Sequence, residues 1–299
     1  MMNPEISFIV VNFNGLTHTR ELLLSMQVHL QRVSCEIIVV DNGSRNNESI
    51  PLSEEFPEVI NIRSEINLGF SGGNNIGIRA SAGKYIMLIN NDTLLCDSSV
   101  SELVKMLESD SSIGAVSPKI HFISPPGTIQ FAGFTEMTCI TLRNRGVGYN
   151  EYDRGQYNTP AETASTHGAA MMVKREVIEK IGYMPEIYFL YYEELDWCTK
   201  MKEFGYKLMY QPAALIIHKE SQSTGSDSYL KRYYLTRNRL LFARRNRKGI
   251  VRLLAIVYQL LVADIKLIML SLVKGRKDLV MATLRGIYGY FMLNKGSAK

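Results

Sequence analysis

Short apolar runs alternate with helix-type patterns through the first 120 residues, and this alternation constrains the fold more than any other feature of the chain. The strand-like runs lie at residues 6–11, 36–40, 59–62, 85–89 and 114–117. Apolar residues at helical spacing lie between them, at residues 17–30, 69–82 and 100–107. Continuous apolar strands separated by helices indicate a mostly parallel central sheet with helices on both faces. The sequence therefore predicts an α/β fold.

Polar side chains follow three of these predicted strands. They are Asn12 with Asn14, residues 41–44, and residues 90–92. In a parallel sheet, ligands bind beyond the carboxyl ends of the strands, where these clusters are expected to meet. Asn, Asp and Gly are also common turn residues, so each cluster taken singly is better explained as a turn. The three clusters together favour a site for a nucleotide-type ligand.

The chain continues with less regular segments. Residues 125–166 are richer in Gly, Asn, Tyr and Pro, and we interpret them as a strand-and-loop insertion that faces an acceptor. We expect the following elements after it: a strand at 165–173, a helix at 193–204, a strand at 208–218 and a flexible polar loop at 220–228.

The net charge of +5 hides an uneven distribution. From Asp227 onward there are 16 Lys and Arg against 3 Asp and Glu, or +13, which leaves 18 basic and 26 acidic residues, or −8, in the rest. Basic tails most often bind phosphate-bearing partners, such as nucleic acid or a membrane surface. The apolar run at 253–263 is short, and its extension to residue 273 includes Asp264 and Lys266. We therefore expect an amphipathic helix in the membrane interface rather than a spanning helix, with a core-packed helical hairpin as the alternative.

The cysteine spacing and the N-terminus indicate the compartment. The four cysteines, at positions 35, 96, 139 and 198, lie far apart and form no C-x-x-C pair, which favours structural thiols in a reducing compartment. No basic segment precedes the first strand, so no cleaved signal peptide is expected. These features predict a cytoplasmic protein.

A series of motifs along the chain resembles a known family. The motifs are VVNFNG (10–15), VVDNGS (39–44), NLGFSGGNNIGI (67–78), INND (89–92), HGAAMMV (167–173) and YYEELDWC (191–198), followed by His218. In this order they resemble the inverting family 2 glycosyltransferases, and most of all the rhamnosyltransferase-like branch, over residues 5–245. The resemblance implies a GT-A fold, a nucleotide-diphosphate sugar donor and a divalent cofactor, Mg²⁺ or Mn²⁺.

The implied metal ligands are Asp92, His218 and Asn90. Residues 90–92 stand where the family carries its D-x-D-type motif. Because Mg²⁺ and Mn²⁺ prefer oxygen ligands, Asp92 would supply a charged oxygen and Asn90 a neutral amide oxygen. His218 ends a predicted strand where similar proteins place a histidine near the metal, although a lone histidine there is otherwise a surface or capping residue. This set has one carboxylate instead of two.

Three carboxylates, Glu193, Glu194 and Asp196, open the predicted helix at 193–204. Inversion at an anomeric carbon needs one general base to deprotonate the acceptor hydroxyl. The resemblance implies that this base is Glu194, a glutamate where the family has an aspartate, with Glu193 beside it and Asp196 holding the helix start. Neighbouring carboxylates are expected to raise the pKa of the base. Acidic residues also favour helix N-termini, which explains one or two of the three without catalysis.

The resemblance also implies donor-binding residues. Asp41 matches the position that contacts the nucleobase or ribose, with Asn12 and Asn14 beside it. A turn at residues 72–74 is expected to let the backbone approach the donor. Arg237 is a candidate to fold over the pyrophosphate, with the start of a basic surface as the alternative. The complete predicted set is Asn12, Asn14, Asp41, Asn67, Gly72, Gly73, Asn74, Asn90, Asn91 and Arg237.

These predictions combine into one organisation. A GT-A catalytic domain is expected at residues 1–228, with a nucleotide-binding half at 1–120 and an acceptor-side half at 121–228, and a basic amphipathic helical region at 229–299. The resemblance implies transfer of a hexose, with rhamnose from dTDP-rhamnose as the candidate, to a glycan acceptor on a polyprenyl diphosphate. The basic region would hold the enzyme on the cytoplasmic face of an anionic membrane. A second copy of the chain is a further candidate partner, and no nucleic acid is expected.

Two other function classes are open from the residues alone. One is a nucleotidyltransferase that makes sugar nucleotides, although VNFNG lacks the Gly-, Arg- and Lys-rich phosphate loop typical after the first strand of such enzymes. The other is a non-catalytic module that binds nucleotides or nucleic acid, for which the basic tail with its interleaved tyrosines would be the main feature.

Overall fold

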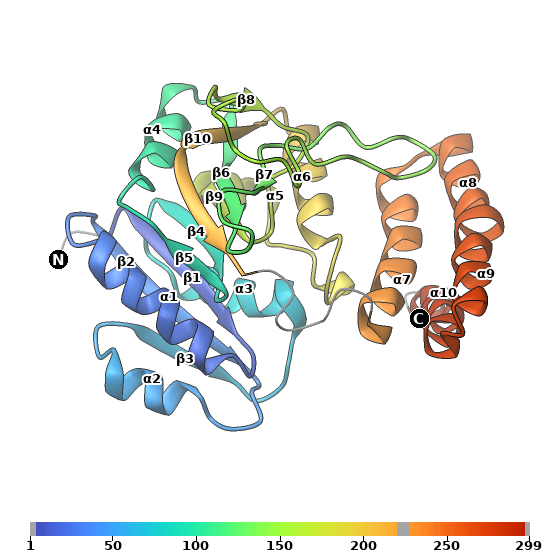
Figure 1. The fold of residues 1–299 in the computed structure, drawn as a ribbon, viewed down its shortest axis with the longest axis horizontal. Helices are drawn as coiled ribbons and strands as arrows, with labels where there is room; N and C mark the ends of the chain where they lie inside the picture. Colours follow the sequence, from blue (N-terminus) through green and yellow to red (C-terminus); the bar gives the residue numbers. More distant parts are fainter. Residues whose placement is uncertain (1–3, 220–227, 297–299) are drawn as a thin grey trace. The chain divides into compact units, whose positions relative to one another are not determined.

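A computed structural model describes residues 4–219 and 228–296 (Figure 1). Within the described residues the chain divides into two compact units. The first contains residues 4–135, Arg145–Phe189 and residues 193–219, and the second contains Glu136–Asn144, Leu190–Tyr192 and residues 228–296. The polar loop expected at 220–228 lies outside the described residues except for its last position.

One sheet forms the centre of the first unit. Its strands are β1 (Ile6–Asn12), β2 (Cys35–Asn42), β3 (Ile60–Ser64), β4 (Tyr85–Asn90), β5 (Thr93–Leu95), β6 (Ile113–Phe122), β7 (Ile129–Phe131), β8 (Ala161–Glu162), β9 (Ala170–Lys174) and β10 (Lys207–His218). The strand order is β3-β2-β1-β4-β9-β6-β10-β5, with β7 paired to β6 and β8 paired to β10.

The sheet is parallel in its first part and mixed beyond it. Strands β3, β2, β1 and β4 run parallel to one another, whereas β9 lies antiparallel between β4 and β6. Of the remaining pairings in the described residues, only β6 with β10 is parallel. The expectation of a mostly parallel sheet is therefore wrong beyond β4. A crossover between parallel strands usually contains an α-helix, and no helix lies between β7 and β9.

Helices cover both faces of this sheet, as expected (Figure 1). They are α1 (Leu16–His29), α2 (Ser49–Glu55), α3 (Gly69–Ala80), α4 (Ser101–Ser109), α5 (Arg175–Ile181) and α6 (Glu193–Glu203), with a short 3₁₀ turn, η1 (Glu186–Tyr188), before α6. Side chains alternate along each strand, so Phe8 and Val10 join the apolar cluster under α1, α2 and α4. Ile9 points the other way, into the cluster under α3, α5 and α6.

The second unit is helical. Its helices are α7 (Tyr229–Asn246), α8 (Gly249–Tyr258), α9 (Asp264–Val273) and α10 (Lys277–Gly296), and a π-helical turn, η2 (Gln259–Ala263), joins α8 to α9 without a break. Within the unit, α7 packs against α8 and α10, and α10 packs against α9.

The continuous helix Gly249–Val273 corrects one expectation. It has 25 residues and a segment of mean hydropathy 2.1, so by length and composition alone it could cross a membrane. The sequence argument treated Asp264 as an interruption, but this side chain is 0% exposed and accepts a hydrogen bond from Gln259 Nε2 at 2.7 Å. The opposite side of the helix is apolar and exposed, with Leu261 at 63% and Val273 at 84%. The expectation that this apolar segment is too short to cross a membrane is therefore wrong.

Candidate functional site

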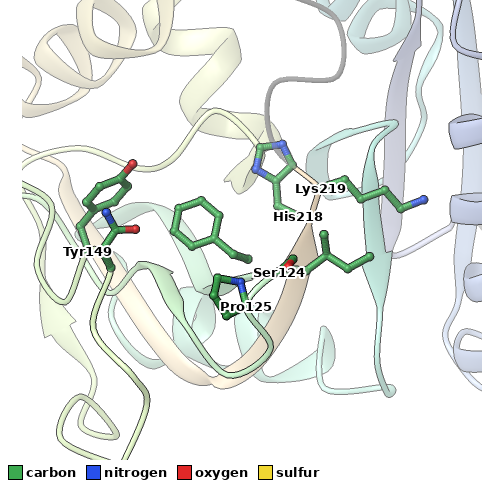
Figure 2. Close-up of a pocket in the computed structure, with 8 residues that line it drawn as sticks. Ser124, Pro125, Tyr149, His218 and Lys219 are labelled. Atoms are coloured by element: carbon green, nitrogen blue, oxygen red, sulfur yellow. The ribbon is translucent and has the colours of Figure 1, made fainter. Parts of the chain in front are cut away.

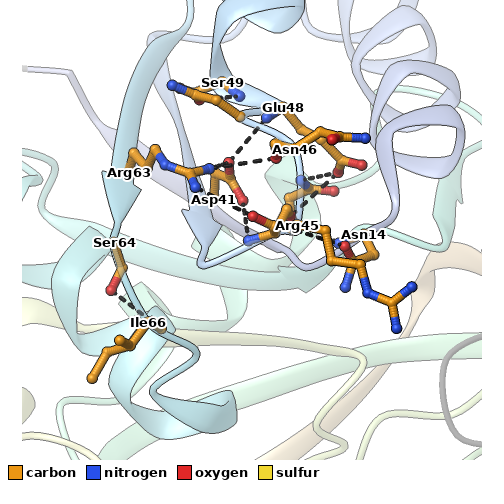
Figure 3. Close-up of polar contacts among 12 residues, drawn as sticks. Asn14, Asp41, Arg45, Asn46, Glu48, Ser49, Arg63, Ser64 and Ile66 are labelled. Atoms are coloured by element: carbon orange, nitrogen blue, oxygen red, sulfur yellow. Dashed lines mark hydrogen bonds and ion pairs between the residues drawn. The ribbon is translucent and has the colours of Figure 1, made fainter.

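Asp41, at the end of β2, is held by donors from the protein itself (Figure 3). Its side chain is 0% exposed. One carboxylate oxygen accepts from the Ser44 backbone N–H at 3.0 Å, and the other accepts from Glu48 N–H at 3.1 Å and from Arg63 Nη1 at 2.5 Å. With both oxygens engaged, Asp41 shapes the loop after β2 rather than presenting an exposed oxygen to a ligand.

Asn12 and Asn14 are both joined to the loop after β2, Asn12 through Glu48 and Asn14 through Ser44. Asn12, at the end of β1, donates to Glu48 Oε2 at 2.7 Å and accepts from Thr19 Oγ1 at 2.8 Å. Asn14 has a left-handed backbone (φ 51°), and its N–H donates to Ser44 Oγ at 2.8 Å. Glu48 thus connects the loops after β1 and β2, and the sequence reasoning missed it. The one feature of the sequence that could have pointed to Glu48 is its position directly before α2, in the short loop that follows Asp41.

The glycines at 72 and 73 lie inside α3, so the turn expected there is wrong. A Cβ added to Gly73 would lie 2.8 Å from Val11 Cγ1, and one added to Gly72 would lie 2.5 Å from Leu68 Cβ. Asn74 donates to the Phe70 carbonyl within the same helix at 2.9 Å. The glycines therefore serve close packing of the helix, and they form no open phosphate loop.

The loop that leads into α3 is tightly arranged. Asn67 Oδ1 accepts from Gly69 N–H at 2.8 Å and from Asn42 Nδ2 at 3.2 Å. Gly69 has φ +73°, and an added Cβ there would lie 2.1 Å from the Phe189 carbonyl oxygen. That oxygen accepts from Phe70 N–H at 2.7 Å, and Phe189 itself is left-handed at φ 66°. This contact connects the loop after β3 with the segment that precedes α6.

Asp92 and His218 come together at the edge of the sheet. Asp92 is in the turn between β4 and β5, and β5 pairs with the end of β10 so that His218 is opposite Thr93. His218 Nε2 lies 3.1 Å from Asp92 Oδ1, and His218 Nδ1 lies 2.8 Å from Gln130 Oε1 on β7. Asp92 is 9% exposed. Two predicted ligands that lie 126 positions apart in sequence are thus neighbours.

The two asparagines before Asp92 have different surroundings. Asn91 donates to Thr19 Oγ1 at 3.1 Å and lies 3.5 Å from Asn12 Oδ1, so it belongs to the hydrogen-bond network of Asn12. Asn90 is half-buried, and its backbone carbonyl accepts from Thr93 Oγ1 at 2.6 Å. The roles expected for both in ligand binding stay predictions.

The side chains of Asp92 and His218 could act as ligands of a divalent cation that has only a few protein ligands. No group of three or more His, Cys, Asp or Glu side chains in the described part of the chain is placed to hold a metal ion. The Gln130 carbonyl oxygen can only accept, so the His218 Nδ1 carries a proton, and in the neutral ring the Nε2 lone pair faces the Asp92 carboxylate. Two acceptors at 3.1 Å require a proton or a cation between them. Mg²⁺-type ions are often held by one or two protein ligands together with waters and substrate phosphates.

The three carboxylates of α6 have separate environments. Asp196 is buried and accepts from the Tyr188 hydroxyl at 2.6 Å, which fastens η1 to α6. Glu193 is buried as well. Burial raises the pKa of Glu194, and its own backbone N–H and that of Leu195 partly oppose the shift. The predicted direction agrees with this, and burial is the largest cause of the shift.

The carboxyl group of Glu194 lies beside the segment that leads into β9. A Cβ added to Gly168 would be 3.8 Å from the Glu194 carboxyl carbon. Gly168 follows His167, whose ring centre is 6.3 Å from that of His218. The sheet thereby brings the candidate base into the same region as the candidate metal ligands.

Comparison with known proteins identifies this arrangement. Residues 7–182, more than half of the chain, match the family described as glycosyl transferase family 2. The chain belongs to glycosyl transferase family 2. It is therefore a glycosyltransferase, and the resemblance read from its motifs is confirmed.

Three curated relatives of this glycosyltransferase cover most of its length. The low-salt glycan biosynthesis hexosyltransferase Agl10 of Haloferax volcanii is 26% identical over 80% of this chain and 76% of its own. The dTDP-rhamnosyl transferase RfbF of Shigella flexneri is 25% identical over 96% and 97%. The N-acetylglucosaminyl-diphospho-decaprenol L-rhamnosyltransferase of Mycobacterium tuberculosis is 22% identical over 76% and 80%.

A solved structure supports the fold. The mannosyltransferase PcManGT of Pyrobaculum calidifontis, solved with GDP-Man and Mn²⁺, aligns with a TM-score of 0.58 at 16% identity, over 100% of this chain and 81% of its own. The α/β GT-A fold expected from the sequence, with its additional C-terminal helices, is confirmed.

His167 lies beside the candidate ligand His218, and it belongs to a motif of the sequence for which no role was predicted. Its Nδ1 accepts from Ala169 N–H at 3.1 Å, and its ring stacks on Phe134 with centres 5.9 Å apart. Burial lowers the pKa of His167 to about 3, with nearby His218 as the second cause. The ring is therefore neutral, and because Nδ1 is an acceptor, Nε2 carries the proton.

Arg237 belongs to the helical unit and is buried there. Its Nε donates to Asn238 Oδ1 at 2.8 Å, and its guanidinium lies 4.7 Å from the ring centre of Tyr234 and 5.7 Å from that of Tyr233. The alternative expected from the sequence, the start of an exposed basic surface, is wrong for this residue because the tyrosines of α7 cover it. Its role toward a pyrophosphate stays a prediction.

A pocket of about 250 Å³ opens beside His218 (Figure 2). It is lined by Phe122, Ile123, Ser124, Pro125, Tyr149, Asn150, His218 and Lys219. The Phe122 and Tyr149 rings meet edge to face at 5.7 Å, and Lys219 is paired with Glu21. The insertion thus contributes one wall of a cavity at the carboxyl ends of β6 and β10.

Proposed function

We propose that this glycosyltransferase moves a hexosyl group from a nucleotide diphosphate to a glycan acceptor with inversion, and that rhamnose from dTDP-rhamnose is the first donor to test. The observation that carries the proposal is the separation of two acidic groups with different surroundings. Asp92 faces the imidazole of His218, as a cation-binding carboxylate would. Glu194 is half-buried beside Gly168, in a setting that raises its pKa as a general base requires.

The proposed reaction is a single displacement. Glu194 accepts the proton of the acceptor hydroxyl while the acceptor oxygen forms a bond to the anomeric carbon. The bond from that carbon to the diphosphate oxygen breaks on the opposite side, and the electron pair leaves with the nucleotide diphosphate. Asp92 and His218 would hold the divalent ion, with Asn90 as a further candidate ligand. When bound, that ion neutralises charge on the departing diphosphate.

The remaining predicted residues are assigned to the donor and to the frame of α6. Asn12, Asn14, Asp41 and Asn67 hold the loops after β1, β2 and β3, which in an α/β sheet line the ligand crevice. We assign residues 1–120 to donor binding, residues 121–228 to the acceptor side and residues 229–299 to attachment. Glu193 and Asp196 hold the start of α6 so that Glu194 is presented.

Rhamnose and a lipid-linked acceptor are supported by the relatives. RfbF, whose similarity extends over nearly the whole of both chains, is named for dTDP-rhamnose. The M. tuberculosis relative is named for a sugar on a diphospho-decaprenol acceptor. The cofactor, Mg²⁺ or Mn²⁺, is supported by the Mn²⁺ in PcManGT and by the oxygen and nitrogen donors at Asp92 and His218.

The test is a donor panel with the purified full-length chain. Release of nucleoside diphosphate is measured with dTDP-rhamnose, UDP-GlcNAc and GDP-mannose, with a polyprenyl-diphosphate-linked GlcNAc acceptor, and with Mg²⁺, Mn²⁺ or EDTA. The anomeric configuration of the product is read by NMR. We expect one donor to turn over, with inversion, in a metal-dependent way. Retention of configuration would refute the single displacement, and turnover unaffected by EDTA would refute the metal assignment.

We propose that the second unit attaches the enzyme to the cytoplasmic face of an anionic membrane. The exposed apolar side of Gly249–Val273 is flanked by Lys248, Arg252 and Lys274, all of them exposed. The opposite side is buried within the unit, which favours a helix that lies in the interface over one surrounded by lipid. Each basic residue near an anionic surface contributes about 1 kcal/mol, so loss of these three should weaken binding about 100-fold.

Vesicle co-sedimentation tests the attachment. The triple variant of Lys248, Arg252 and Lys274 to Gln is compared with wild type on phosphatidylglycerol and phosphatidylcholine vesicles. A matched control changes three exposed basic residues of the first unit, Arg20, Lys84 and Lys105, to Gln. Equal loss in both variants would mean that only net charge matters. If light scattering shows that the wild-type chain is a dimer, and this dimer does not bind vesicles, the apolar face is covered by a second copy of the chain.

A further inference from the structure

Gln130 is a buried amide in an apolar setting. It is the middle residue of β7, it is 4% exposed, and its neighbours Ile129 and Phe131 are fully buried. Burying a polar amide without a partner costs about 1–3 kcal/mol, so such a residue in a three-residue strand needs a specific partner. The partner is His218 Nδ1, 2.8 Å from Gln130 Oε1.

The pairing of β7 with β6 makes this contact possible. Ile120 is opposite Phe131 and His121 is opposite Ile129, with a register irregularity between them. β6 also pairs in parallel with β10, where Phe122 is opposite His218. β7 and the end of β10 therefore lie on either side of β6, and Gln130 reaches across to a residue 88 positions away in sequence.

We propose that Gln130 is a positioning residue, which fixes the tautomer and ring orientation of His218 so that Nε2 is directed at a divalent cation shared with Asp92. The amide oxygen accepts from Nδ1–H and so leaves the lone pair on Nε2, which is 3.1 Å from Asp92 Oδ1. Metal-binding histidines commonly donate their other N–H to such a carbonyl, and loss of that partner lowers metal affinity about 10–100-fold. This inference rests on the proposed role of Asp92 and His218 as ligands.

The first experiment measures cation binding without turnover. Mn²⁺ is titrated into the full chain in the presence of dTDP, and free Mn²⁺ is followed by electron paramagnetic resonance. Gln130→Met, which keeps the side-chain length but removes the acceptor, should weaken Mn²⁺ binding about 10–100-fold. Gln130→Glu, which keeps an acceptor oxygen, should restore it to within a few-fold of wild type.

A matched control separates positioning from loss of stability. Gln211 on β10 is also a buried glutamine, and its Oε1 accepts from a backbone N–H, that of Ala213, at 3.2 Å. Gln211→Met should lower the melting temperature but leave Mn²⁺ affinity unchanged. Equal loss of Mn²⁺ affinity in the Gln130→Met and Gln211→Met variants would overturn the proposal, because it would trace the effect to packing.

A second readout is independent of metal and of activity. Two-bond ¹H–¹⁵N NMR spectra of the metal-free chain distinguish the two neutral tautomers of a histidine. His218 should show the Nδ1–H form in wild type and a mixture in Gln130→Met. The Nε2–H form in wild type, or unchanged Mn²⁺ affinity in Gln130→Met, would overturn the inference. A wild-type chain that transfers sugar but binds no Mn²⁺ would overturn it as well, while leaving glycosyl transfer established.

Discussion

The Gly69→Ala substitution tests the contact between the donor-side loop and the segment before α6. The added Cβ would lie 2.1 Å from the Phe189 carbonyl oxygen and within 2.8 Å of the Phe189 carbonyl carbon and Cα. Phe189 is itself held in the left-handed region and accepts a hydrogen bond from Phe70. It must therefore move by about 1 Å to reach the 3.0 Å that Cβ contacts require.

The cost of this change has two parts. Gly69 has φ +73°, and an alanine in the left-handed region costs about 1–2 kcal/mol. The steric conflict adds about 1–3 kcal/mol, as overpacking of a tight site does. The expected loss in the free energy of unfolding is about 2–5 kcal/mol. Gly205 provides the matched control because it has φ +87° with nothing within 4 Å of an added Cβ. Gly205→Ala should cost only the first part, about 1–2 kcal/mol.

Urea unfolding followed by circular dichroism measures both variants against wild type. Initial rates are then compared at a urea concentration where all three chains are fully folded. Because Phe189 lies a few residues before Glu194, we expect Gly69→Ala to lower kcat about 100-fold, the effect of a displacement near 1 Å, and Gly205→Ala to leave it unchanged. If Gly69→Ala costs no more stability than Gly205→Ala, the contact with Phe189 is refuted.

Three further changes follow from the contacts described above. Burial raises the pKa of Glu194, so the ionised base is lost as pH falls through a value above the ordinary 4.5, and wild-type kcat should fall with it. Glu194→Gln should lower kcat about 100- to 10,000-fold above that pKa, and this deficit should shrink below it. The raised pKa means that ionised Glu194 destabilises the folded state. Glu194→Gln should therefore melt at a higher temperature than wild type at pH 8. A lower melting temperature would contradict the burial of Glu194. Arg63→Met leaves the buried Asp41 carboxylate without its cation and should lower the free energy of unfolding by about 2 kcal/mol and weaken dTDP binding, measured by calorimetry. Lys119→Met should cost about 3 kcal/mol in urea unfolding, because the Asp153 carboxylate then loses a buried partner at 2.8 Å.

The strands that could be predicted from the sequence are those whose own residues form a recognisable apolar pattern. β1, β2 and β4 are long apolar runs, and their alternation between two cores follows from strand geometry alone. β5, β7 and β8 have two or three residues each. β5 and β8 pair with β10, which is distant from them in sequence, and β7 pairs with the nearby β6. Their sequences are too short to show a period, and the contacts of His218 with Asp92 and Gln130 depend on β5 and β7.

The candidate site was predictable in part for the same reason. Asp92 and His218 could be named because the family resemblance places its metal ligands after one predicted strand and at the end of another, whereas Glu48 and Gln130 lie in short segments without a pattern. The turn predicted at Gly72–Gly73 is wrong because glycine permits both a turn and close helix packing. The Val11 side chain lies so close to Gly73 that the glycine serves close packing. The two residues are about sixty positions apart in sequence, so their contact is visible only in the structure.

The carboxylates of this chain are distinguished by the hydrogen bonds that each one receives. Asp41 accepts from three donors of the protein and has no free oxygen, which is the condition of a structural group. Glu194 accepts from backbone N–H groups at a helix start but is buried enough for its pKa to rise, which suits a base. Asp92 faces Nε2 of His218 at 3.1 Å, and the two groups require a proton or a cation between them. The sequence shows three acids after strands or at a helix start. The hydrogen-bond donors and the burial around each one distinguish the structural carboxylate from the proposed base and the proposed cation ligand.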